Sequence, residues 1–225
     1  IDNMEQALER AVANGVKNLV VQPTHLMHGA EYDEMCEAID NYREHFESVS
    51  VAEPLLGEVG SDATVINDDK EAVAKAVVAA AVADSDFESL DAAKEAGTAF
   101  VFMGHGTAHV AKVSYSQMQS QMQLLGYENV FIGTVEGEPE ETSCEAVIEA
   151  VKAAGYTNVI MRPLMVVAGD HANNDMAGEE EDSWKSMFEA AGLTVDCQIA
   201  GLGGIADVQA LYIAHTKAAI DALTA

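Results

Sequence analysis

Hydrophobic residues follow two different spacings along the chain. Short apolar runs alternate with longer segments in which apolar residues recur every three or four positions, so that they would share one face of a helix. Continuous apolar runs bounded by glycine or polar residues are typical of buried strands, and the helical spacing is typical of amphipathic helices. The runs predict strands at 16–21, 49–53, 98–103, 129–135, 158–167 and 194–199. The segments between them predict helices at 3–14, 31–46, 69–83, 110–125, 143–154, 179–191 and 207–223.

Strands that alternate with helices favour an α/β fold, in which helices cover both faces of a parallel sheet. A repeat refines this prediction. Gly15, Asn18, Pro23 and Gly29 recur 140 positions later as Gly155, Asn158, Pro163 and Gly169. We therefore expect two similar, flavodoxin-like halves, each a parallel sheet flanked by helices.

The repeat also divides the chain. We expect an N-terminal half-domain at 1–95, completed by the last helix at 206–225, and a C-terminal, metal-binding half-domain at 96–205. The second half has a strand, a helix and another strand ahead of its helix at 143–154, whereas the first half begins at the equivalent helix. This predicts that the first half is incomplete and lacks its first strands, so that the chain is a truncated form.

Composition excludes several classes of protein. The net charge of −27 argues against nucleic acid and anionic membranes as partners, because both need a basic surface. The longest segment of low polarity, 72–83, is too short to span a bilayer. Cys36, Cys144 and Cys197 lack the spacing of a disulfide framework or a zinc ribbon, which favours free thiols in a reducing cytoplasm.

Three consecutive strands of the second half are followed by side chains that can bind metal. His105, Glu136 and His171 come after the strands at 98–103, 129–135 and 158–167. The carboxyl ends of parallel strands share one edge of the sheet, so these residues can converge there. Two imidazoles and a carboxylate suit cobalt, nickel, iron or zinc and leave positions open for a substrate. The simpler alternatives are that His105 caps a helix and that Glu136 is a solvated loop carboxylate.

The other histidines carry weaker signals. His25 and His28 flank the end of the first half's strand and are candidates for the wall of a cleft. His45 and His215 lie in helical patterns, where surface or packing roles are the simplest interpretation. His109 follows His105 by one helical turn, but His105 precedes that helix, so we do not expect the two to act together.

Three segments resemble one family. FVFMGHGT at 100–107, GTVEGEP at 133–139 and MRPLMVVAGDHANNDMAGEEEDSW at 161–184 are similar to the anaerobic-pathway sirohydrochlorin cobalt chelatases, the class II chelatase family of cobalamin biosynthesis. VVQPTHLMHGAEY at 20–32 fits the same family. The family's chain normally starts with a strand that ends in a Ser-Phe-Gly-Thr-Ser type of turn, and nothing here matches it.

The resemblance implies a lyase that inserts cobalt(II) into sirohydrochlorin without ATP or another nucleotide and releases two protons. It implies His105, Glu136 and His171 as cobalt ligands, with His105 or His171 also the catalytic proton acceptor. It further implies the tetrapyrrole as partner. From charge and cysteine usage we expect a cytoplasmic enzyme with no nucleic acid or membrane partner, and a homo-oligomer stays open. The alternatives are an iron or nickel chelatase on the same scaffold and a non-catalytic tetrapyrrole- or metal-binding protein.

Sirohydrochlorin carries several carboxylates, whereas this chain is acidic. Backbone N–H groups at helix starts could assist in binding them. Arg162, Lys112 and Arg10 are the few basic candidates, and the simplest interpretation of each is an ordinary surface residue.

Overall fold

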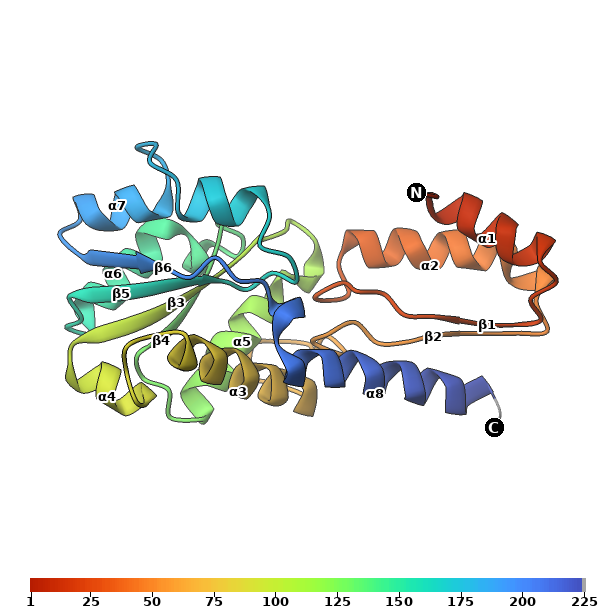
Figure 1. The fold of residues 1–225 in the computed structure, drawn as a ribbon, viewed down its shortest axis with the longest axis horizontal. Helices are drawn as coiled ribbons and strands as arrows, with labels where there is room; N and C mark the ends of the chain where they lie inside the picture. Colours follow the sequence, from red (N-terminus) through yellow and green to blue (C-terminus); the bar gives the residue numbers. More distant parts are fainter. Residues whose placement is uncertain (224–225) are drawn as a thin grey trace.

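The computed structural model describes residues 1–223, which form two lobes that each contain a parallel sheet (Figure 1). This confirms the α/β fold. The larger sheet has the strand order β4-β3-β5-β6, with β3 (Thr98–Gly104), β4 (Val130–Thr134), β5 (Asn158–Pro163) and β6 (Thr194–Cys197). The smaller sheet pairs β1 (Asn18–Val21) with β2 (Ser48–Val51). None of the helices within 1–223 is both long and apolar enough to cross a membrane.

The α-helices within residues 1–223 are α1 (Met4–Ala13), α2 (Ala30–Tyr42), α3 (Asp68–Ala83), α4 (Leu90–Glu95), α5 (Val113–Leu124), α6 (Cys144–Ala153), α7 (Trp184–Ala190) and α8 (Ala206–Leu223). Five of them cover the two faces of the larger sheet. α6 and α7 lie on one face, and α3, α4 and α5 lie on the other (Figure 1). Every residue of β3 is buried, because neighbouring strands flank it and helices cover both of its faces.

Three local features depart from the sequence pattern. Helix α4 was not predicted; its start is capped by Ser89, whose hydroxyl accepts a hydrogen bond from the Ala92 N–H. The helix expected from 179 begins only at Trp184, because Ser183 caps it. The strand expected through 167 ends at Pro163, and a π-helical turn, His171–Met176, follows the loop after it.

The smaller lobe has its own apolar core, formed mainly by Leu8, Met35, Ile39 and Phe46. Helix α8 packs on β1 and β2 from the side opposite α2 (Figure 1). The last element of the chain therefore covers the first sheet. Residues 224–225 of the helix expected at 206–225 lie outside the described residues.

Helices α3 and α4 pack in the core of the larger lobe. Val73, Val77 and Ala93 belong to the same buried cluster as Phe100 and Phe102 of β3. We therefore propose that the boundary between the halves lies just after β2, near residue 53, in place of the boundary expected at 95.

A buried lysine holds the segment that links the two lobes. Lys70 in α3 is fully buried, and its Nζ donates hydrogen bonds to the carbonyl oxygens of Leu56 (2.9 Å) and Glu58 (2.8 Å). The Leu56 N–H in turn donates to the Leu26 carbonyl at 2.9 Å. Burial lowers the pKa of Lys70 to about 8, although the charges of Asp69 and Glu53 oppose the shift. The lysine thus fixes a linker that itself holds the loop after β1.

This pKa gives a testable dependence of stability on pH. Between pH 8 and the ordinary lysine pKa of 10.5, the unfolded chain holds a proton that the folded chain has released, so stability should rise with pH. We expect wild type to gain about 1–2 kcal/mol relative to Lys70→Met between pH 8 and pH 9.5. Urea unfolding of both proteins at the two pH values measures this difference. Parallel pH profiles for the two proteins would contradict the lowered pKa.

Candidate metal centre

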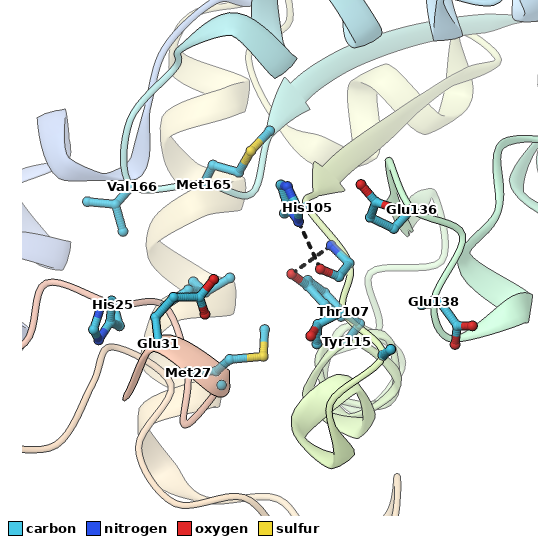
Figure 2. A pocket seen from close by; sticks show the side chains of 14 residues that line it. His25, Met27, Glu31, His105, Thr107, Tyr115, Glu136, Glu138, Met165 and Val166 are labelled. Atoms are coloured by element: carbon cyan, nitrogen blue, oxygen red, sulfur yellow. Dashed lines mark hydrogen bonds between the residues drawn. The ribbon is translucent and has the colours of Figure 1, made fainter. Parts of the chain in front are cut away.

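A cleft of about 700 Å³ opens between the two lobes, at the carboxyl ends of the central strands (Figure 2). The first half contributes the loop after β1 and the start of α2, including His25, Met27 and Glu31. The second half contributes the loops after β3, β4 and β5, including His105 and Glu136. The cleft is therefore shared by both halves.

Strand register brings these loops to one edge. Gly104 at the end of β3 pairs with Thr134 of β4, and Met103 pairs with Pro163 of β5, so the three strands end at nearly the same level. Gly106 allows the loop after β3 to lie against the loop after β4. It has φ +92°, and a Cβ there would lie 2.8 Å from the Cβ of Glu136. Only glycine fits this turn without strain.

The structure brings His105 and His171 together. Their ring centroids are 4.6 Å apart, with an interplanar angle of 80°. His105 Nδ1 lies 2.9 Å from the carbonyl oxygen of Gly106, and His171 Nδ1 lies 2.5 Å from Oδ2 of Asp175. Both partners accept hydrogen bonds, so each Nδ1 carries the proton in the neutral ring. Each Nε2 then keeps a lone pair that can bind a metal or a proton.

Glu136 lies next to this pair but does not complete a three-ligand cluster. It lines the same cleft as His105, and its backbone N–H donates to the His105 carbonyl at 2.9 Å. However, within residues 1–223 no group of three or more His, Cys, Asp or Glu side chains is placed to hold a metal ion. The predicted histidine pair is thus assembled, whereas the role of Glu136 as a ligand stays a prediction.

The cleft is acidic. Glu31 and Glu138 line it together with Glu136, and the described lining contains no lysine or arginine. Lys112 lies just outside, where its Nζ is 2.7 Å from Oε2 of Glu138. Glu31 occupies the repeat position equivalent to His171, so the offset of 140 was the sequence signal that could have identified it. A lining of carboxylates and imidazoles attracts a metal cation.

The remaining histidines make structural contacts or lie apart from the pair. His28 Nε2 contacts Oε2 of Glu53 at 2.6 Å, and His215 Nε2 contacts Oδ1 of Asp69 at 3.0 Å. His109 does not act with His105; its Nε2 contacts Oδ2 of Asp33 in α2 at 3.1 Å and so bridges the two lobes. His45 is exposed at the far end of α2.

The basic candidates for carboxylate binding do not line the cleft. Arg162 is not a surface residue: it is buried, and its Nη1 lies 2.6 Å from Oδ2 of Asp84. Arg10 is exposed and pairs with Asp2 at 2.5 Å. With Lys112 held by Glu138, these basic side chains are all engaged by acidic partners.

Comparison with known proteins gives consistent matches. The family model described as "Cobalt chelatase (CbiK)" matches residues 1–221. The sirohydrochlorin cobaltochelatase of Salmonella typhimurium (strain LT2) is 31% identical over 221 residues, which cover 98% of this chain and 75% of that protein. The sirohydrochlorin cobaltochelatase CbiKC of Nitratidesulfovibrio vulgaris (strain Hildenborough) is 30% identical over 224 residues, covering 99% of this chain and 72% of that protein.

Two solved structures share the fold. The sirohydrochlorin chelatase SirB from Bacillus subtilis subspecies spizizenii, in complex with cobalt, matches with a TM-score of 0.55 and 16% identity over 98% of this chain and 76% of SirB. SirB from Bacillus subtilis with Fe3+ matches with a TM-score of 0.60 and 17% identity over 96% of this chain and 77% of SirB. At these identities the likeness supports the fold alone.

The contact between His171 and Asp175 gives a testable prediction. Asp175→Ala should weaken cobalt(II) binding by about 10- to 100-fold, because it removes the carboxylate that orients the imidazole. Isothermal titration with cobalt(II) measures the affinity. Asp170→Ala is the matched control, since Asp170 carries the same charge directly before the π-helical turn and its side chain makes no cap hydrogen bond there. Equal losses in both variants would mean that general charge, and not orientation, sets the affinity.

Proposed function

The chain belongs to the CbiK family of cobalt chelatases, and we propose that it inserts cobalt(II) into sirohydrochlorin in the cleft between its lobes. The observation that carries the proposal is the pair of cleft-edge imidazoles, His105 and His171, each with its Nε2 lone pair free. Such a pair can hold a divalent metal while most coordination positions stay open for the pyrrole nitrogens.

The reaction requires an exchange of metal for protons. Cobalt(II) is the substrate metal, and its binding to the macrocycle displaces the protons of two pyrrole N–H groups. As the metal leaves His105 and His171, both Nε2 lone pairs become available, so the two imidazoles can take up the two protons released. The Asp175 carboxylate accepts from Nδ1 of His171 and the Gly106 carbonyl accepts from Nδ1 of His105, so each Nε2 stays available for a proton. The exchange balances without a nucleotide.

Glu136 is proposed as the third metal ligand. Its backbone already lies beside that of His105, so a change of side-chain conformation alone can bring its carboxylate to the metal. A third ligand that joins only in one state of the site holds the metal less firmly than a closed structural site does. This suits an enzyme that must give the metal away.

The rest of the cleft suits a flat macrocycle. Leu26 and Met27 from the first half and Met165 and Val166 from the second offer apolar surface in the cleft. Figure 2 shows Met27, Met165 and Val166 at its walls. A tetrapyrrole that enters between the lobes can bury its ring faces against these side chains. Its centre can then lie near the histidine pair, at the edge of the larger sheet.

Two further points belong to the proposal. The donors would also accept iron or nickel, but the family and both relatives at about 30% identity are named for cobalt, so we do not propose another metal. We place the reaction in the cytoplasm, since Cys36, Cys144 and Cys197 are free thiols that suit a reducing compartment. Assembly into a homo-oligomer stays a prediction.

Removing either imidazole should abolish most of the catalysis. His105→Ala and His171→Ala should each lower the rate of cobalt insertion by about 100-fold or more, and the double variant should lose little beyond that, because the pair acts as one unit. The change in the sirohydrochlorin absorption spectrum on addition of cobalt(II) follows the rate, with the spontaneous reaction subtracted. His45→Ala is the control, since it removes an exposed histidine outside the cleft. Undiminished rates in both single variants would refute the site assignment.

A further inference from the structure

We propose that His25 binds a carboxylate of the tetrapyrrole by donating a hydrogen bond from Nε2. This inference rests on the proposed function and adds a substrate contact to it. The residue lies in the loop after β1, on the wall of the cleft that the first half contributes (Figure 2). In Figure 2 it lies at the end of the cleft away from Glu136 and Glu138.

The backbone of His25 is held in place from two sides. Its carbonyl oxygen accepts hydrogen bonds from the Leu55 N–H at 3.1 Å and from the Tyr212 hydroxyl at 2.9 Å. The ring meets Tyr32 edge-on, with centroids 6.5 Å apart. The imidazole is therefore positioned before any ligand arrives, which lowers the entropic cost of binding.

The ring itself has no polar partner. Nδ1 is buried and makes no hydrogen bond within the described chain, and Nε2 makes none either. In five other histidines at least one ring nitrogen makes a hydrogen bond, namely His28, His105, His109, His171 and His215. Since Nδ1 is closed off from solvent, Nε2 is the nitrogen that can meet a ligand. A fixed imidazole that lines a ligand-sized cleft and has no hydrogen-bond partner is positioned to bond to a ligand.

Charge identifies the partner as a carboxylate. His25 and His105 are the only side chains in the described cleft lining that contain nitrogen, and His105 is committed to the metal pair. Sirohydrochlorin carries its carboxylates around the ring periphery, far from the central nitrogens that receive the metal. A donor at the end of the cleft away from Glu136 and Glu138 matches such a peripheral group in chemistry and position, and Glu31 is the acidic lining residue on the same wall as His25.

The same geometry argues against His25 as a proton acceptor. An N–H at Nδ1 would be buried where the structure supplies no acceptor, whereas an N–H at Nε2 can meet a ligand in the cleft. The neutral ring with its proton on Nε2 avoids that unpaired N–H. His25 therefore acts as a donor to the substrate and takes no part in the exchange of metal for protons.

The test measures binding separately from catalysis. Titration of the protein with sirohydrochlorin, in the absence of cobalt, should show about tenfold weaker binding for His25→Ala, the loss expected for one hydrogen bond to a charged group. His25→Gln, whose amide retains an N–H donor, should recover part of the affinity. At saturating sirohydrochlorin, kcat should stay within about twofold of wild type. His45→Ala is the matched control, and thermal melting checks that each variant is folded.

A second probe removes the proposed partner. With sirohydrochlorin whose carboxylates are methyl esters, wild type and His25→Ala should bind with nearly equal affinity, because no charged acceptor is left. A merely structural role for His25 would weaken the binding of both probes equally and would overturn the inference. So would an unchanged affinity for free sirohydrochlorin, or a fall in kcat at unchanged affinity, which is the result expected of a proton acceptor.

Failure of the proposed function gives a different result. If wild type binds sirohydrochlorin but does not accelerate cobalt insertion, the chelatase proposal is lost, while the comparison of affinities still decides the role of His25. If wild type does not bind sirohydrochlorin at all, both are overturned. His105→Ala should show the converse of His25→Ala, with cobalt insertion lost and tetrapyrrole affinity retained.

Discussion

The hydrogen-bond register of β3 with its two neighbours is the constraint on which the site depends. Because Gly104 pairs with Thr134 and Met103 with Pro163, three loops start from one edge of the larger sheet. A strand that ended two residues earlier would move its loop by roughly 7 Å, more than the separation of the two histidine rings. The approach of His105 to His171 thus depends first on the register of the sheet and only then on the loops.

Local contacts then decide what the imidazoles can do. The Gly106 carbonyl and the Asp175 carboxylate take the Nδ1 protons, so both rings present an unprotonated nitrogen without needing a metal to select the tautomer. The acidic lining draws cations to the same place, whereas it repels the substrate's own carboxylates. Glu136 and Glu138 lie at one end of the cleft, whereas the wall of the first half carries Glu31 together with His25 and apolar side chains (Figure 2).

Much of this arrangement was readable from the sequence, and the failures have identifiable causes. Apolar runs located the six strands of residues 1–223, and strand ends predicted that His105 and His171 would lie together, because parallel strands share one common edge. The packing of α3 with the larger sheet was not readable, because an Ala/Val-rich helix that is buried on most sides has no polar face to show its direction. The burial of Arg162 was missed for a related reason: its partner, Asp84, lies 78 positions away in sequence. Side-chain conformation, on which the role of Glu136 depends, has no periodic signature at all.

Helix α8 has a consequence for how the molecule is made. It closes the smaller sheet through contacts between residues very far apart in sequence: the Tyr212 hydroxyl donates to the His25 carbonyl 187 positions away, and the Thr216 hydroxyl donates to Gln22 194 positions away. Such contacts form slowly, because a long loop must close before they contribute any stability. The larger lobe can fold through contacts between residues closer in sequence, whereas β1 and β2 are covered on their second face only when α8 packs on them. We therefore expect the cleft wall that carries His25 to reach its native form after the larger sheet does, so the histidine pair forms before the cleft is complete.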